Sequence, residues 1–219
     1  MSSSALRDPA VAEIVEQAGG AARVVAPEKV EHLARSETHQ GVVAHAAPLR
    51  PADLDDLAAA TDAFLVVLDG VTDPRNLGAI IRTAETAGAT GVVVGRHRSA
   101  HVSPAVTKAA AGAIEHVPIA VVGGIPAALD RVKRAGCWTV GLDERADRSV
   151  HDLDLAGERV ALVLGAEGRG LARLTRERCD LLVRIPMHGR VPSLNVSAAA
   201  AVVLHEVARQ RSGVPGTAR

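Results

Sequence analysis

Short apolar runs alternate with amphipathic segments over the last two thirds of the chain. The apolar runs are rich in Val, Leu and Ile, as buried strands are, and cover residues 64–70, 91–95, 116–122, 137–142, 160–165 and 181–186. Apolar residues recur at helical spacing over residues 76–88, 103–112, 126–136, 170–178 and 196–210. This alternation predicts an α/β fold, a parallel sheet with helices on both faces, whose ligands bind at the carboxyl ends of the strands.

The pattern before residue 64 is less regular. It predicts a helix over residues 8–18, a turn at Gly19 and Gly20, a short strand over 23–26, a helix beginning at Pro27 and a strand over 40–46. Residues 48–62 contain two prolines and clustered Asp, which indicates a linker or a short connecting helix. We therefore expect a small α/β piece in front of the main domain.

Composition narrows the function classes. The 219 residues are 47% hydrophobic but only 1% aromatic, which disfavours a surface that binds single strands by base stacking. No apolar stretch approaches the roughly 20 residues that span a bilayer, and the N-terminus lacks the pattern of a signal peptide, so we expect a cytoplasmic protein. Cys137 and Cys179 lie at no metal-ligand spacing, nor do the histidines, so we expect structural thiols and no metal.

The net charge of zero hides a segregation of charge along the chain. Residues 1–74 hold five basic and twelve acidic side chains, whereas residues 75–108 hold five basic and one acidic, and residues 159–219 hold ten Arg and four acidic. The two basic blocks are also the blocks that carry the Gly-rich loops. Positive charge around these loops points to an anionic partner, although a solvated basic face is the plainer explanation.

Three of the predicted strand ends carry loops with more glycine and polar detail than a connection needs. Their notable residues are Asn76 and Arg82 in the first loop and its helix, Gly165, Glu167, Gly168 and Gly170 in the second, and Ser193 and Asn195 in the third. The second loop is not the dinucleotide-binding fingerprint, and it follows a late strand instead of the first. The usual phosphate-binding motifs are therefore ruled out.

Taken together and in this order, the loops resemble the three signature motifs of the SpoU family of RNA 2′-O-ribose methyltransferases. The matching strings are Asn76-x-Gly78-x-x-x-Arg82-x-x-x-x-x-Gly88, Leu164-Gly165-Ala166-Glu167-Gly168, and Ile185-Pro186-Met187 followed by Ser193-Leu194-Asn195-Val196-Ser197. The resemblance covers residues 64–211. It implies S-adenosylmethionine (AdoMet) as cofactor, RNA as substrate, a homodimer, and a C-terminal segment threaded into a deep trefoil knot.

The resemblance also implies roles for single residues. The cofactor-binding set it implies is Gly165, Gly168, Ile185, Met187 and Leu194, with Met187 packed near the adenine, and the catalytic set is Asn76, Arg82, Glu167, Ser193 and Asn195. In the family the matching arginine is the proposed proton acceptor. Because a guanidinium resists deprotonation, we favour Arg82 as an anchor for an RNA phosphate and a stabiliser of developing alkoxide charge.

Residues 23–25 and 39–44 resemble the end of a ribosomal-protein-like RNA-binding domain that precedes the catalytic domain in rRNA-modifying members. The usual first strands and helices of that domain are missing. We therefore expect a partial RNA-binding domain over residues 1–46, a linker over 47–63, the methyltransferase domain over 64–211 and a flexible tail over 212–219. This partial domain favours a guanosine of 23S rRNA as the methylated nucleotide.

Plainer explanations exist for several of these residues. Arg82 can pair with Glu85 one turn further along its helix, Asn76 can cap that helix, and Glu167 can cap a helix beginning at Gly170. The small and apolar residues over 198–207 favour a homodimer interface on the last helix.

Three other functions remain as alternatives. They are ribose methylation of tRNA, RNA or ribosome binding without catalysis, and a nucleotide-dependent oxidoreductase. The missing Gly-rich turn after the first strand counts against the oxidoreductase.

Overall fold

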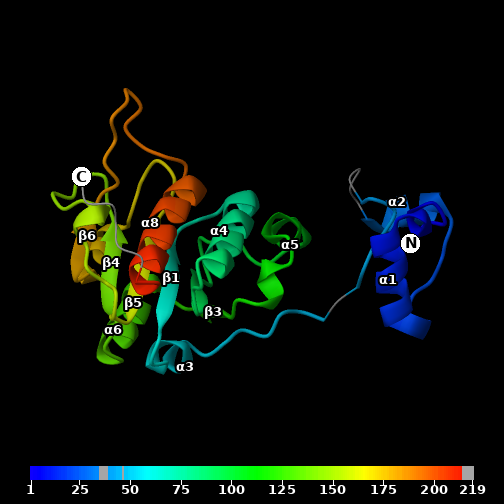
Figure 1. The fold of residues 1–219 in the computed structure, drawn as a ribbon, viewed down its shortest axis with the longest axis horizontal. Coiled ribbons are helices and arrows are strands. Elements are labelled where there is room, and N and C mark those ends of the chain that lie inside the picture. The colour runs from blue at the N-terminus through cyan, green and yellow to red at the C-terminus, as the bar shows by residue number, and fades with distance from the viewer. Residues whose placement is uncertain (35–38, 46, 214–219) are drawn as a thin grey trace. The chain divides into compact units, whose positions relative to one another are not determined.

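The computed structural model describes residues 1–34, 39–45 and 47–213, and the chain divides into two compact units, residues 1–49 and residues from 50 onwards. The larger unit is built on a six-stranded sheet (Figure 1). Its strands are β1 (Phe64–Asp69), β2 (Gly91–Gly95), β3 (Ile119–Val122), β4 (Trp138–Leu142), β5 (Val160–Gly165) and β6 (Leu181–Val183). They follow the order β3-β2-β1-β5-β4-β6, and every neighbouring pair is parallel, which confirms the predicted sheet type.

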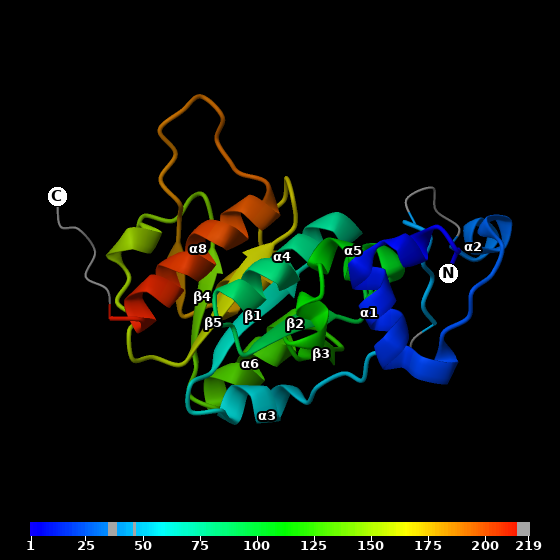
Figure 2. The same ribbon diagram turned by 45° about the vertical axis from the view of Figure 1, so that its right-hand side comes forward.

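Helices cover both faces of this sheet, as predicted (Figures 1 and 2). One face is covered by α4 (Pro74–Thr86), α5 (Pro104–Ala110) and α8 (Val196–Arg211), and the other by α3 (Leu54–Ala59) and α6 (Ile125–Arg134), with α7 (Arg173–Arg178) packed beside α6. Short 3-10 turns lie at Ala113–Glu115 and Val150–Asp152. In β1, Phe64, Val66 and Leu68 face the first layer while Leu65 and Val67 face the second, because successive side chains of a strand alternate.

Two close contacts position the helices of the first layer. An ideal Cβ on Gly78 would lie 2.4 Å from the Cβ of Ala109, so this glycine lets α4 and α5 approach closely. Arg211 at the end of α8 stacks over the ring of Phe64, 4.9 Å from its centroid, and donates hydrogen bonds to the carbonyls of Asp62, Ala63 and Glu158. These contacts fix the end of α8 at the amino edge of the sheet.

Several predicted boundaries change. The helix predicted from Gly170 begins at Arg173, because Gly170 has a positive φ of 65° that no helix accommodates. The strands predicted over 116–122 and 181–186 shorten to Ile119–Val122 and Leu181–Val183. Trp138 lies in β4 as predicted, but its side chain is 45% exposed and not part of the core. The short connecting helix predicted within 48–62 is α3, whose Leu54 and Ala58 are buried in the larger unit.

The first unit contains α1 (Pro9–Ala18) and α2 (Pro27–Ala34), with short 3-10 turns at Ala5–Arg7 and Gly19–Ala21. Both helices are confirmed. The strand predicted over 23–26 is wrong, because Val25 forms only an isolated bridge with Ser2. The strand predicted over 40–46 is also wrong over residues 40–45: Gln40 and Gly41 have positive φ values of 51° and 78°, which turn the chain instead of extending it.

Two of the predicted segments extend beyond the residues that the structure describes. Residue 46, the end of the second predicted strand, and residues 214–219 of the predicted tail lie outside the described residues. Among the helices of the described ranges, none has the length and apolar character required to cross a membrane.

Candidate active site

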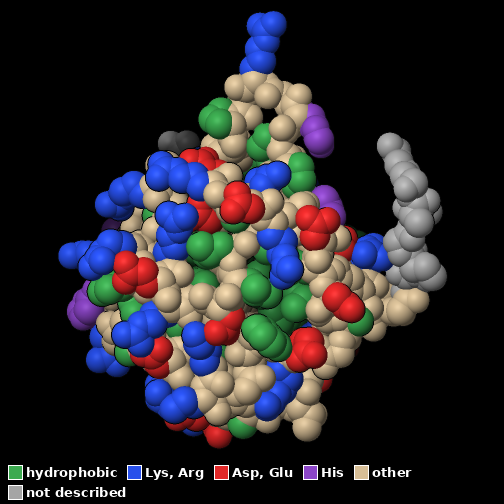
Figure 3. Space-filling view, turned by 90° about the vertical axis from the view of Figure 1, so that its left-hand side faces the viewer, with side chains coloured by type: hydrophobic (Ala, Val, Ile, Leu, Met, Phe, Trp, Pro, Cys, Tyr) green, Lys and Arg blue, Asp and Glu red, His purple; other side chains and the backbone are tan. Residues whose placement is uncertain are grey.

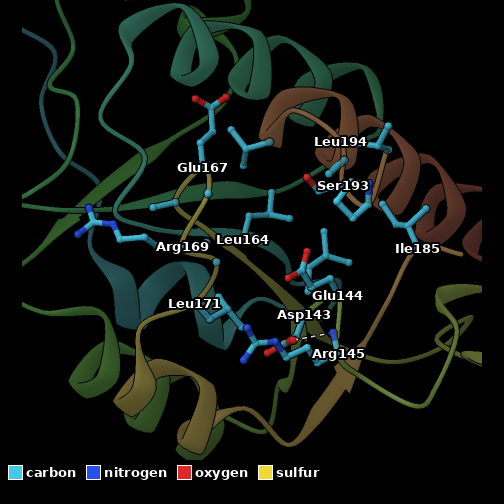
Figure 4. Close-up of a pocket in the computed structure, with 18 of the residues that line it drawn as sticks. Asp143, Glu144, Arg145, Leu164, Glu167, Arg169, Leu171, Ile185, Ser193 and Leu194 are labelled. Carbon is cyan, nitrogen blue, oxygen red and sulfur yellow. Dashed lines mark hydrogen bonds between the residues drawn. The ribbon is translucent and has the colours of Figure 1, made fainter. Parts of the chain in front are cut away.

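The carboxyl ends of β4, β5 and β6 surround a cavity of about 570 Å³. Figure 4 shows Glu144 after β4, Leu164 in β5 and Ile185 after β6 arranged around it, together with Leu194 from the segment before α8. All five residues predicted to bind the cofactor line this cavity, namely Gly165, Gly168, Ile185, Met187 and Leu194. Glu167 and Ser193 from the predicted catalytic set line it as well. The second and third motif loops therefore meet at one cavity.

One wall of the cavity is a tight turn after β5. The backbone N–H of Ala166 donates to the carbonyl of Gly170 at 3.1 Å, and the N–H of Gly170 donates back to Ala166 at 2.8 Å. Gly168 and Gly170 both have positive φ, which closes the turn. An ideal Cβ on Gly165 would lie 2.1 Å from the carbonyl carbon of Gly170. Position 165 therefore requires glycine because the turn folds back directly against it.

Three predicted catalytic residues from three different loops form one hydrogen-bonded cluster. The side-chain amides of Asn76 and Asn195 both donate to Oε1 of Glu167, at 2.7 and 2.6 Å, and Asn195 also donates to Oδ1 of Asn76 at 3.2 Å. Asn76 is only 8% exposed, so a partner for its amide is needed there. We call these three residues the amide–carboxylate cluster. It joins the first, second and third motifs.

Neither Asn76 nor Glu167 acts as the helix cap that the sequence allowed. Asp73, not Asn76, caps α4, since its Oδ1 accepts from the N–H of Arg75 at 2.7 Å. Glu167 caps no helix: α7 begins after Ala172, which makes no side-chain cap. Asn195 has a double role, because its Oδ1 caps α8 by accepting from the N–H and the hydroxyl of Ser197 while its amide donates to the cluster.

A smaller cavity of about 210 Å³ lies on the other side of the cluster. It is lined by the loop Gly70–Asp73 and by Asn76, and it shares Ala166, Glu167, Arg169 and Val196 with the larger cavity. The turn after β5 therefore forms a common wall between two cavities.

Arg82 lies apart from both cavities. It is exposed on α4, six residues beyond Asn76 and hence about 9 Å further along the helix axis, and it lines neither cavity. The alternative partner, Glu85, forms no ion pair with it within the described part of the chain. The structure thus brings together four of the five predicted catalytic residues around the cavities and leaves Arg82 outside.

Both cysteines have the features of structural thiols. The thiol of Cys137 is buried and donates to the carbonyl of Ala58 at 3.4 Å, and burial raises its pKa. Burial also raises the pKa of the Cys179 thiol, to about 12, with Asp180 adding to the effect. Over the described ranges, no three His, Cys, Asp or Glu side chains come close enough together to hold a metal ion.

The three loops that form the site match those of a known protein family. Residues 63–205, which contain all three loops, match the model of the SpoU rRNA Methylase family. The chain belongs to this family.

Relatives and solved structures agree with the SpoU assignment. The 23S rRNA (guanosine-2′-O-)-methyltransferase RlmB of Bordetella pertussis is 46% identical over 204 residues, which cover 92% of this chain and 83% of the relative. The SpoU methyltransferase AviRb from Streptomyces viridochromogenes, solved in complex with AdoMet, aligns with a TM-score of 0.69 and 34% identity over 75% of this chain and 67% of its own. The TrmH/SpoU tRNA modifying enzyme of A. aeolicus aligns with a TM-score of 0.62 and 26% identity over 73% and 83%. The predicted family and the α/β fold are confirmed.

The three SpoU motifs do not account for the whole cavity. Asp143, Glu144 and Arg145, which follow β4, also line it, and an ion pair of 2.9 Å joins Asp143 to Arg176 of α7. The sequence analysis missed this loop because it has no glycine-rich motif. Its position after a strand was the available signal, since ligands in parallel sheets lie at the carboxyl ends of strands.

Proposed function

We propose that this chain transfers a methyl group from AdoMet to the 2′-hydroxyl of a guanosine ribose in 23S rRNA. The observation that carries the proposal is the meeting of all three SpoU motifs at two adjoining cavities, through the amide–carboxylate cluster. The name of the Bordetella relative supports 23S rRNA guanosine as the substrate. The likeness to the A. aeolicus tRNA modifying enzyme keeps tRNA as the second candidate.

The residues of the larger cavity fit AdoMet. Leu164, Ile185 and Leu194 offer apolar surface suited to an adenine, and the glycines of the turn after β5 leave backbone groups open to polar contacts. The solved AviRb complex supports this choice of cofactor. When bound, AdoMet supplies an electrophilic methyl group.

The chain itself must position and polarise the acceptor hydroxyl, which is a poor nucleophile at neutral pH. Glu167 already accepts two amide hydrogen bonds, so its role in the proposal is to orient the cavity wall. The Ser193 hydroxyl lies at the cavity and is available to orient the ribose or the methionine part of the cofactor. Arg82 anchors an RNA phosphate and stabilises alkoxide charge. Because Arg82 lies apart from both cavities, this role requires bound RNA or a second subunit to bring the acceptor ribose close to its guanidinium.

The proposal includes the trefoil knot. Residues 143–150 contact the end of β6 and the residue after it: the N–H of Asp143 donates to the carbonyl of Val183, and the N–H of Val150 donates to the carbonyl of Arg184. Further along, Leu155 donates to Gln210 of α8. These bonds support a loop between β4 and β5 that surrounds the segment leading from β6 to α8.

A homodimer is also part of the proposal. On α8, Ala198, Val202 and His205 are exposed on one face of the helix. Val203 and Val207 are buried in the chain's own core. Small side chains permit close approach of a second helix. Light scattering at micromolar concentration should find a dimer, and a monomer with full activity would refute it.

The remaining proposals concern organisation. Residues 1–46 act as an RNA-binding segment, residues 47–63, which include α3, connect it to the catalytic part, and residues 64–211 form the methyltransferase domain. We also propose a cytoplasmic location.

Mapping of 2′-O-methyl sites by mass spectrometry, in rRNA and tRNA with and without the gene, tests the function. Loss of one guanosine mark in 23S rRNA is expected, and loss of a tRNA mark would favour the second candidate. Equilibrium dialysis should show binding of AdoMet without RNA, and a site that prefers NAD would contradict the proposal.

A further inference from the structure

Four arginines with unused guanidinium groups lie in or next to segments that line the smaller cavity, and one of them, Arg169, lines the cavity itself. Arg75, Arg96, Arg98 and Arg169 are all exposed, and within the described ranges no hydrogen bond or ion pair engages any of their guanidinium groups. We call these four residues the basic ridge. Each guanidinium retains five N–H donors in a planar fork.

Gly70 lies next to two segments that carry members of the basic ridge. An ideal Cβ on Gly70 would lie 3.4 Å from the Cβ of Ala166 and 3.9 Å from the carbonyl oxygen of Arg98. The loop after β2 is tied to the same region, because the N–H of Ala100 donates to the carbonyl of Val71 at 2.8 Å. Arg75 lies in the first turn of α4, next to the cavity-lining Asp73. The backbones of Arg75 and Arg98 therefore lie next to the loop Gly70–Asp73 that lines the smaller cavity, and Arg169 lines the cavity itself.

The backbone holds these arginines in place. Arg169 lies within the turn that the two hydrogen bonds between Ala166 and Gly170 close. The N–H of Arg96 donates to the carbonyl of Val122 at 2.7 Å, and Arg98 has a positive φ of 54°, which is uncommon for a residue with a side chain. Such a conformation persists only where the surroundings impose it.

Arginines on the β6 side of the sheet differ. Arg176 pairs with Asp143, Arg173 with Glu177 and Arg178 with Asp130. Figure 3, which views that side, shows Lys and Arg interspersed with Asp and Glu. These three arginines are therefore compensated within the protein, whereas the guanidinium groups of the basic ridge have no such partner in the described ranges and are available to a ligand.

We propose that the basic ridge binds the phosphodiester backbone of the substrate RNA and leads the target nucleotide into the smaller cavity. The inference rests on the proposed function. Arg169, which lines both cavities, lies where a phosphate next to the methylated ribose would pass, and its side chain points away from Ser193 and Leu194 (Figure 4). A planar fork of donors suits phosphate oxygens better than a point charge does. Arg96 and Arg98 then bind phosphates further along the strand.

The test compares the double variant Arg96→Ala/Arg98→Ala with wild type, using a 23S rRNA transcript as the probe. Fluorescence anisotropy over a salt series should show weaker RNA binding, with the slope of log K against log salt reduced by about one for each arginine removed. The KM for RNA should rise while kcat at saturating RNA stays near wild type. AdoMet affinity should not change, because neither residue lines the larger cavity.

Arg134→Ala is the matched control. Arg134 is exposed at the end of α6, lines neither cavity, and its guanidinium forms no hydrogen bond or ion pair in the described ranges. It should keep wild-type RNA affinity and salt slope. An equal loss in the control would overturn the proposal, because it would show a general charge effect.

Arg169→Ala gives an independent reading, since it should raise KM for RNA and also lower kcat. Unchanged RNA affinity and salt slope in the double variant would overturn the ridge even if wild type methylates rRNA. Conversely, a wild-type protein that binds RNA through the ridge but transfers no methyl group would refute the proposed function and leave the ridge in place.

Discussion

The two units of the chain bury very different amounts of apolar surface. The larger unit has a core on each face of its sheet, whereas the described residues of the first unit bury only Ser2, Ala5 and Val30. Ile14 and Val24 of the first unit remain 60% and 53% exposed. Because apolar burial is the main favourable term in folding, the larger unit carries most of the stability. It also carries both cavities and every predicted site residue.

The largest expected effect is a difference in the free energy of unfolding between core mutations in the two units. Leu129 on α6 is fully buried and belongs to none of the three motifs, so Leu129→Ala should lower the free energy of unfolding by about 2–5 kcal/mol. The matched change Ile14→Ala, in the first unit, should cost no more than about 0.5 kcal/mol. Denaturant titration measures both. Similar losses would show that the first unit has a core of comparable weight.

The next prediction sharpens the comparison at the level of catalysis. Arg82→Ala should reduce methyl transfer by at least roughly a hundredfold, since one charge-stabilising contact in the transition state is lost. Arg82→Lys should retain a detectable fraction, and both variants should bind AdoMet normally, because Arg82 lines neither cavity. If the Arg82→Lys variant is as inactive as the Arg82→Ala variant across a pH series, the result supports Arg82 as the proton acceptor. If the Arg82→Ala variant keeps near-normal activity, Arg82 has no part in catalysis.

A third prediction concerns the amide–carboxylate cluster. Asn195→Asp replaces a donor to Glu167 with a second carboxylate, which should cost up to about 1 kcal/mol of stability at pH 7 because both side chains are exposed. Lower pH should recover part of that loss, because one proton shared by the two carboxyl groups restores a donor. Thermal unfolding from pH 7 to pH 5 measures it. Asn195→Ser, which keeps a cap but adds no charge, should show no such recovery.

A smaller, pH-dependent effect is expected at Asp180, in the larger unit but away from the cavities. Although burial alone would raise its pKa, the Lys133 ammonium at 2.7 Å and two hydrogen bonds from Thr139 lower it. A lowered folded-state pKa stabilises the protein above the ordinary value of 3.8, and that stability disappears as pH falls through the folded value. Asp180→Asn should therefore lower Tm at pH 7, and the difference from wild type should vanish in acid. A constant difference would contradict this.

The smallest effect should follow removal of residues 1–49. AdoMet affinity, measured by calorimetry, should stay within about twofold of the full chain, because every residue lining the larger cavity lies beyond position 141. A loss of RNA affinity in the same variant would support the proposed RNA-binding role of the first unit. A loss of AdoMet affinity would show that the two units depend on each other.

The sequence predicted most of the larger unit and failed on the strands of the first. Continuous apolar runs such as 91–95 identify buried strands whatever their neighbours are. Residues 40–45 contain a similar short apolar run, but Gln40 and Gly41 turn the chain there and no strand among the described residues pairs with it. A strand needs a partner as well as a pattern. For the site, the sequence predicted the three motif loops. It did not predict that the loop after β4 lines the larger cavity or that Arg82 lies outside both cavities.

By itself, the sequence determined the alternation of strands and helices, the parallel sheet and the three motif loops, because local periodicity and glycine positions depend on nearby residues. Only the tertiary structure decided the strand order, which places β4 beside β5 and so brings Asp143 to the cavity. It also joined Asn76 to Glu167 and Asn195, which are 91 and 119 residues away along the chain. Such contacts form because packing of both sheet faces selects one arrangement of the strands, and no local pattern records that choice.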